Sequence, residues 1–103
     1  MIIEKNTRMT DEQINALVKA GFSRWTKYGK DRLYVTNAAI GLVLDHYNTG
    51  NIKYAELNGE WISNSRARDL EYAIRGAYID IETGYITGSK TAIELIKSTI
   101  DNI

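Results

Sequence analysis

A five-residue pattern occurs three times in this chain and constrains its fold more than any other feature. The copies are Tyr34–Ala38, Trp61–Ser65 and Tyr85–Ser89. Each copy begins with an aromatic and a β-branched residue, which favour a half-buried strand. Each continues with Ser or Thr followed by Asn or Gly, which favour the start of a helix. The pattern therefore predicts that a strand leads into a helix at three places.

A turn signal precedes each copy and predicts a β-hairpin. Gly29–Asp31 separates two runs of strand-forming residues and indicates a loop of three or four residues. Glu82–Gly84 separates two more such runs. Asn58-Gly59 is the strongest of the three signals, because both residues tolerate the positive φ of a type I′ turn. We therefore expect three hairpins.

Apolar residues at helical spacing follow each hairpin, and one further helix precedes them. Thr10 and Gln13 have the form of a capping box and Gly21 suits a helix C-terminus, so we expect a helix over about 11–20. After the first hairpin, the spacing predicts a helix over 37–47. Its apolar positions are Ile40, Val43, Leu44 and Tyr47. In the first hairpin itself, we expect Trp25, Leu33 and Val35 to be buried.

The predicted fold class is α+β, with an N-terminal helix followed by three ββα repeats at about 22–47, 52–75 and 77–102. Repeats of this length share a core with their neighbours, because one unit cannot bury its own apolar face. We therefore expect residues 1–103 to form one compact domain. The hairpins could join one antiparallel sheet or pack around a pseudo-threefold axis, and we favour a single layer.

Composition excludes several kinds of site. The chain has 13 basic and 13 acidic residues and no cysteine. A neutral domain lacks the overall charge of a dedicated non-specific nucleic-acid binder. The absence of cysteine excludes disulfides and thiol-based sites and fits a reducing cytoplasm. Met1–Asn6 lacks the pattern of a secretory signal, and no apolar run is long enough to cross a membrane.

No group of residues predicts catalysis or a cofactor. His46 is the only histidine and follows Asp45, but adjacent positions of a helix point about 100° apart and do not meet. We interpret His46 as a surface side chain near the end of the expected second helix. The strand acids Glu56 and Asp80 lack the spacing of metal ligands. We therefore predict a protein without enzymatic activity, resident metal or cofactor.

The start of the third predicted helix is one candidate binding site. It carries Arg66 and Arg68 in its first turn, where the helix dipole already supplies partial positive charge. Backbone N–H groups, hydroxyls and guanidinium groups together suit a phosphate or a carboxylate. The candidate residues are Ser63, Asn64, Ser65, Arg66 and Arg68. Alternatively, the two arginines could pair with neighbouring carboxylates, namely Glu60, Asp69 or Glu71.

The first predicted hairpin is the second candidate, because basic side chains alternate there with aromatic ones. Exposed aromatic faces beside cations are typical of surfaces that bind single-stranded nucleic acid or a protein partner. The candidate residues are Arg24, Lys27, Tyr28, Lys30 and Arg32. Alternatively, this is an ordinary hairpin with its aromatic residues in the core and lysines that discourage edge pairing.

Three segments, Arg24–Val35, Tyr47–Ile52 and Asn58–Ala67, resemble parts of small uncharacterised proteins from prophages and mobile elements of Gram-positive bacteria. The resemblance spans about residues 22–88. It implies an accessory factor, a class that includes inhibitors of host defence such as anti-CRISPR proteins. It supplies no catalytic residues.

These observations lead to three hypotheses about function. The first is a non-enzymatic phage accessory protein that binds a host protein or nucleoprotein complex through the first hairpin and the Arg66/Arg68 helix start. The second is direct binding of nucleic acid by the same surface. The third is a dimer that binds an anionic small molecule or nucleotide at Arg66 and Arg68. A homodimer is also compatible with the sequence, because hairpins leave edge strands that must be paired or covered.

Overall fold

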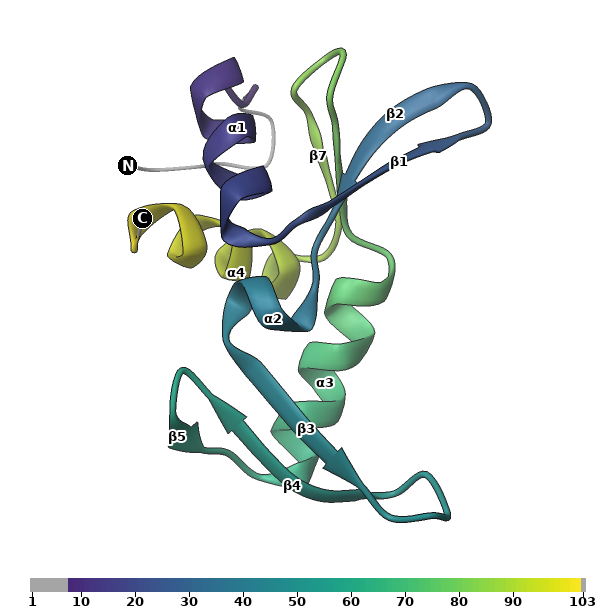
Figure 1. The fold of residues 1–103 in the computed structure, drawn as a ribbon, viewed down its shortest axis with the longest axis vertical. Coiled ribbons are helices and arrows are strands. Elements are labelled where there is room, and N and C mark those ends of the chain that lie inside the picture. The colour runs from purple at the N-terminus through teal and green to yellow at the C-terminus, as the bar shows by residue number, and fades with distance from the viewer. Residues whose placement is uncertain (1–7, 103) are drawn as a thin grey trace.

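The computed structural model describes residues 8–102, which contain four helices and seven strands (Figure 1). The helices are α1 (Asp11–Ala20), α2 (Asn37–Ile40), α3 (Asn64–Arg75) and α4 (Lys90–Asp101). The strands are β1 (Ser23–Lys27), β2 (Lys30–Tyr34), β3 (Leu42–His46), β4 (Ile52–Leu57), β5 (Glu60–Trp61), β6 (Tyr78–Asp80) and β7 (Ile86–Thr87). The segment Met1–Asn6, for which we predicted no secretory signal, lies outside the described residues.

The strands form two antiparallel sheets. Sheet A has the order β1-β2-β6-β7 and joins the first and third hairpins through the pairing of β2 with β6. Sheet B has the order β3-β4-β5 and contains the second hairpin. The two sheets lie toward opposite ends of the longest dimension of the molecule, 39 Å, and α3 runs between them (Figure 1). The hairpins thus do not form the single layer that we favoured.

The α+β class is as predicted, but the pattern of three ββα repeats is not clearly present. The helix predicted over 37–47 is wrong: α2 ends after one turn, and the chain continues as β3. Gly41 ends α2 in the left-handed conformation, with φ 74°, and its carbonyl accepts a hydrogen bond from the Asn58 N–H at 2.8 Å. Leu42 is then buried and Val43 exposed, as in a half-buried strand. No helix in residues 8–102 is long and apolar enough to span a bilayer.

Local signals predicted the other turns and caps more closely. The α1 helix begins with the capping box of Thr10 and Gln13 and ends at Gly21, as predicted. The second hairpin turns at Asn58 and Gly59 with φ values of 52° and 85°, which confirms the prediction of positive φ at both residues. The first hairpin is tighter than predicted. Lys27 pairs directly with Lys30, so that its loop contains only Tyr28 and Gly29.

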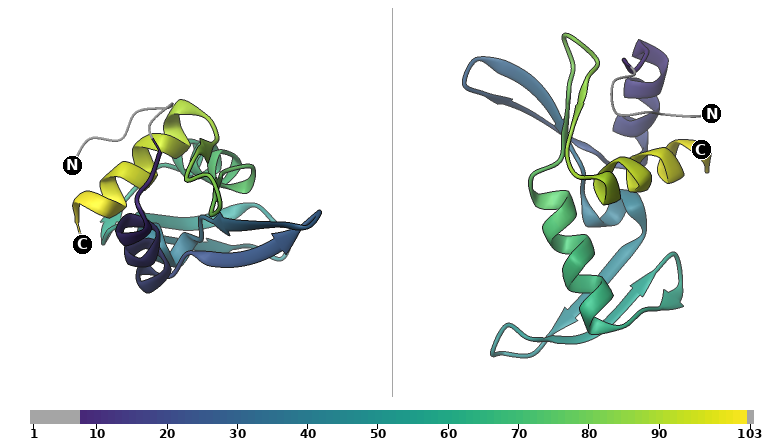
Figure 2. Two further views of the ribbon diagram at one scale, coloured as in Figure 1. Left: turned by 90° about the horizontal axis from the view of Figure 1, so that it is seen from above. Right: turned by 180° about the vertical axis from the view of Figure 1, so that it is seen from behind.

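The main core lies between the inner face of sheet A and the helices, and each of the four helices contributes buried residues to it. Leu33 of β2 and Ile79 of β6 are fully buried there, together with Leu17 of α1 and Ile96 of α4. A smaller cluster lies between sheet B and α3, where Ile52, Ala55 and Ala67 are buried. Figure 2 shows α3 against one face of sheet B only. Within residues 8–102, each sheet therefore packs helices against its inner face, and no helix covers its outer face.

The loop of the third hairpin fixes the start of α1. The Met9 N–H donates to the Gly84 carbonyl at 2.8 Å, and Arg8 Nε donates to the Thr83 carbonyl at 2.6 Å. A Cβ atom added to Gly84 would lie 2.6 Å from the carbonyl oxygen of Met9. The close approach of the two backbones therefore needs glycine at position 84.

Gly29 and Gly84 have similar positive φ values, but only Gly84 is close to another backbone segment. Alanine substitutions at these two positions should therefore separate the cost of backbone strain from the cost of the close approach to Met9. Gly29→Ala places alanine at φ +73° in open space and should lower the free energy of unfolding by about 1–2 kcal/mol. Gly84→Ala, at φ +80°, should lower it further, because the Met9 backbone must also move. Urea unfolding of both variants measures the difference. Equal losses would contradict the close contact between Met9 and Gly84.

Candidate binding surfaces

The register of sheet A places aromatic and basic side chains together on its outer face. Trp25 is directly opposite Arg32, Lys27 opposite Lys30, and Tyr34 opposite Tyr78. Residues directly opposite each other in an antiparallel pair point to the same side. We call this surface the basic face. It comprises Trp25, Lys27, Lys30, Arg32, Tyr34, Tyr78 and Asp80, and Tyr28 lies in the turn at its end.

The prediction that Trp25 is buried is wrong. Its side chain is 63% exposed, whereas Leu33 and Val35 are buried as predicted. The reason is that Trp25 pairs with Arg32 and so points to the outer side of sheet A, opposite to the side on which Leu33 packs into the core. Trp25 Nε1 donates a hydrogen bond to Ser23 Oγ, which fixes the indole along its own strand. An open hollow of about 400 Å³ is lined by Trp25, Thr26, Lys27 and Tyr34.

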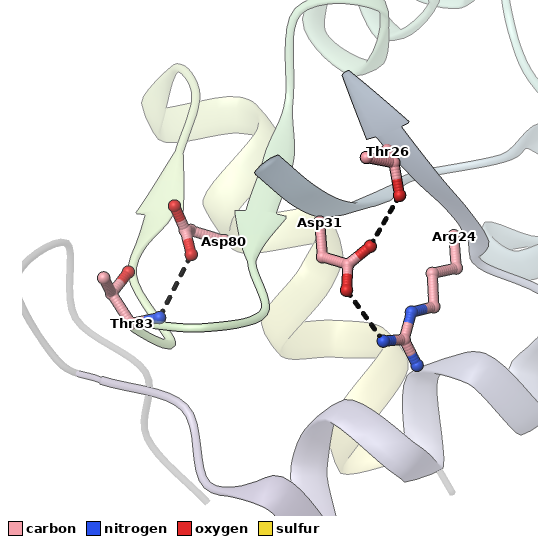
Figure 3. Close-up of polar contacts among 5 residues, drawn as sticks. All are labelled: Arg24, Thr26, Asp31, Asp80 and Thr83. Atoms are coloured by element: carbon pink, nitrogen blue, oxygen red, sulfur yellow. Dashed lines mark hydrogen bonds and ion pairs between the residues drawn. The ribbon is translucent and has the colours of Figure 1, made fainter. Parts of the chain in front are cut away.

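Arg32 contacts two tyrosines, Tyr34 on its own strand β2 and Tyr78 on the neighbouring strand β6. Its guanidinium carbon lies 4.2 Å from the centre of the Tyr78 ring, and Nη1 donates to the Tyr34 hydroxyl at 3.5 Å. The two rings lie 5.7 Å apart. Asp80 is opposite Arg32 in the register, but its carboxylate accepts a hydrogen bond from the Thr83 N–H (Figure 3). The charge of Arg32 is therefore stacked on a ring rather than neutralised by an ion pair within residues 8–102.

Arg24 does not belong to the basic face. It is opposite Leu33 and so points to the inner side of sheet A, where it forms an ion pair of 3.0 Å with Asp31 (Figure 3). Thr26 Oγ1 donates to the other carboxylate oxygen at 2.8 Å. The Thr26 hydroxyl and then the Arg24 guanidinium lower the pKa of Asp31. Arg24 is one of the five binding residues that we predicted in this hairpin. Its guanidinium group instead forms an ion pair that joins β1 to β2.

Tyr28 occupies the tip of the hairpin in an unusual conformation. Its φ is 53°, in the left-handed region that a bulky residue rarely adopts, and its side chain is 85% exposed. Lys27 Nζ lies 5.6 Å from the centre of its ring. The equivalent position of the second hairpin is Asn58, which tolerates this conformation far better. The first hairpin therefore exposes an aromatic ring where local backbone energy favours asparagine.

Two of the predicted binding residues at the start of α3 form hydrogen bonds within the fold. Ser63 caps the helix by accepting a hydrogen bond from the Arg66 N–H at 3.2 Å. Asn64 Nδ2 donates to the Ile52 carbonyl at 3.0 Å and so joins α3 to β4. Ser65, Arg66 and Arg68 are exposed. Within residues 8–102, neither arginine forms an ion pair, so that the pairing considered from the sequence, with Glu60, Asp69 or Glu71, is not observed.

The two candidate sites lie at opposite ends of the molecule. The first hairpin projects from one end, and α3 begins at the other end, next to sheet B (Figures 1 and 2). A single contact surface made of both, as in our first hypothesis, is therefore not present. The sequence also missed Tyr78 as a member of the basic face, because only the pairing of β2 with β6 brings it beside Tyr34.

His46 does not lie at a helix end as we expected, because it is an exposed residue of β3. In residues 8–102, no three His, Cys, Asp or Glu side chains are grouped so that they could hold a metal ion.

The chain matches no protein-family model, and it has no significant match among curated proteins or solved structures.

Replacing Tyr28 by asparagine should stabilise the protein. Tyr28→Asn relieves the left-handed strain and should raise the free energy of unfolding by about 1 kcal/mol. Tyr28→Ala removes the same ring but keeps the strain, so it serves as the matched control and should leave stability nearly unchanged. Urea unfolding compares the variants. If both stabilise the protein equally, the ring and not the backbone conformation is the cause.

Proposed function

We propose that this chain is a phage accessory protein that acts in the host cytoplasm by binding an acidic surface of a host protein or nucleoprotein complex, without catalysis. The observation that carries the proposal is the basic face, where Trp25 and Tyr28 are exposed beside Lys27, Lys30 and Arg32. Trp, Tyr and Arg are the residues most enriched among those that dominate the free energy of binding at protein interfaces.

The stacking of Arg32 supports the choice of this face. A guanidinium group fixed on the Tyr78 ring loses less conformational entropy on binding than a free side chain would. Lys27 and Lys30 are exposed and can steer an acidic partner toward the hairpin. A host-defence inhibitor of the anti-CRISPR kind would bind its target in about a 1:1 ratio. We therefore expect the host partner to be retained in an amount close to that of this chain.

Charge reversal at each end of the molecule tests this function. Lys27→Glu with Lys30→Glu should weaken binding of the retained host partner by about tenfold or more, because like charges placed together across an interface cost several kcal/mol. Arg66→Glu with Arg68→Glu makes the same change of charge at the far end and is the matched control. Tagged pull-down from host lysate, with nuclease treatment, followed by titration of the retained protein measures both.

The control variant should retain the partner at the level of the original protein. Retention by the Lys27/Lys30 variant and loss by the Arg66/Arg68 variant would assign the function to the start of α3 instead. Equal retention by both variants would exclude both surfaces. Thermal unfolding of each variant shows whether loss of binding reflects loss of the fold.

Direct binding of single-stranded nucleic acid is the second candidate, and the arrangement of three aromatic rings favours it. Trp25, Tyr34 and Tyr78 share one face of sheet A with three cations, and successive bases can stack on such rings while phosphates contact the cations. The neutral charge of the whole domain makes us place this candidate second.

For this candidate, the logarithm of the affinity for a mixed-sequence oligonucleotide should fall by about 2 per tenfold rise in salt, since three phosphate contacts contribute about 0.7 each. Trp25→Ala should cost about 1–3 kcal/mol for one lost stacking contact. Quenching of Trp25 fluorescence measures binding in a Trp61→Phe background, which leaves one tryptophan. Absence of quenching at low salt would exclude this candidate.

A further inference from the structure

The outer face of sheet B also carries exposed apolar side chains. Val43 is opposite Glu56, which is opposite Trp61, while Asp45 is opposite Tyr54. Their shared side is the one that α3 leaves uncovered, because Ala55 on the inner side packs against Ala67 of α3. Val43, Tyr54 and Trp61 are 50%, 41% and 68% exposed. Three large side chains gathered on one sheet face are typical of an interaction surface.

The charges of this surface are opposite in sign to those of the basic face. Asp45 and Glu56 are the charged residues among its five side chains, and Lys53, exposed next to Tyr54 at the register shift of β4, adds one positive charge at its edge. Because the carboxylates remain in excess, we call this surface the acidic face. The Tyr54 hydroxyl donates to Glu56 Oε2 at 2.7 Å and holds this carboxylate on the face. This hydrogen bond raises the pKa of Tyr54. On the basic face, Lys27, Lys30 and Arg32 outnumber the single carboxylate of Asp80.

The chain therefore has a positive outer face on sheet A and a negative outer face on sheet B, although its 13 basic and 13 acidic residues cancel overall. Each face joins its charges to exposed aromatic side chains, with Trp25 on one and Trp61 on the other. Complementary charge steers two such surfaces together, and burial of the rings then supplies most of the affinity. A net charge of zero offers no overall repulsion between copies.

We propose that the acidic face of sheet B binds the basic face of sheet A on a second copy of this chain. The contact is heterologous, since it joins two different surfaces, and each copy keeps one free face for a further copy. Self-association would cover Trp25, Lys27 and Lys30 and so compete with any other partner of the basic face. The inference does not depend on the proposed host partner, because purified protein alone is sufficient to test it.

Charge reversal on each face provides the test. Sedimentation velocity of the purified protein should reveal association that grows with concentration and weakens as salt is added. Asp45→Lys with Glu56→Lys, or Lys27→Glu with Lys30→Glu, should each raise the dissociation constant about tenfold or more. An equimolar mixture of the two variants should associate again, because each then offers a face complementary to the other. Asp69→Lys with Glu94→Lys, two exposed helical acids, is the matched control and should associate like the original protein.

Three outcomes would overturn the proposal. One is an unchanged monomer at every concentration in low salt. Another is association lost in the Asp45/Glu56 variant but kept in the Lys27/Lys30 variant, which would mean that sheet B contacts its own counterpart. The third is failure of the mixed variants to associate while both retain the circular dichroism spectrum and thermal unfolding of the original fold.

Discussion

The pairing of β2 with β6 is the interaction on which the rest of the structure depends. It joins hairpins that are distant in the sequence, and it sets two surfaces at once. On the inner side, it brings Leu33 and Ile79 together as fully buried residues of the main core. On the outer side, it brings Tyr78 beneath the guanidinium of Arg32. The core and the basic face are therefore opposite sides of one strand pair, and a shift in register by one residue would exchange them.

Elements specified by neighbouring residues could be predicted from the sequence. The capping box of α1 and the Asn58-Gly59 turn depend on residues close together in the chain, and both are present. The segment after α2 could not be predicted in this way, because Val43 and Leu44 fit a helical as well as a strand pattern. Its conformation is decided by Gly41 and by the ladder with β4, which is a tertiary contact. Here pairing with another strand outweighs local spacing.

The candidate site was only partly predictable for the same reason. Alternation along β1 and β2 identified the residues of the hairpin, but not which of them share a face with an element elsewhere in the chain. Trp25 is apolar and was expected in the core, yet its pairing with Arg32 turns it to the outer side of sheet A, away from Leu33. Arg24 is basic and was expected in the site, yet Asp31 is beside it on the inner side. The register of β1 on β2, and not residue type, places these two side chains on opposite faces of sheet A.

The exposed hairpin must keep its shape without a hydrophobic core beneath it. Four of the five residues of β1 are exposed, so apolar burial contributes little to holding this strand. On the inner side of the hairpin, the carboxylate of Asp31 joins Arg24 and Thr26 of the opposite strand. Such contacts are weaker than core packing but directional, and they join β1 to β2 across the hairpin. The position of Trp25 and Lys27 on the basic face therefore depends on a polar cluster on the opposite side of the same two strands.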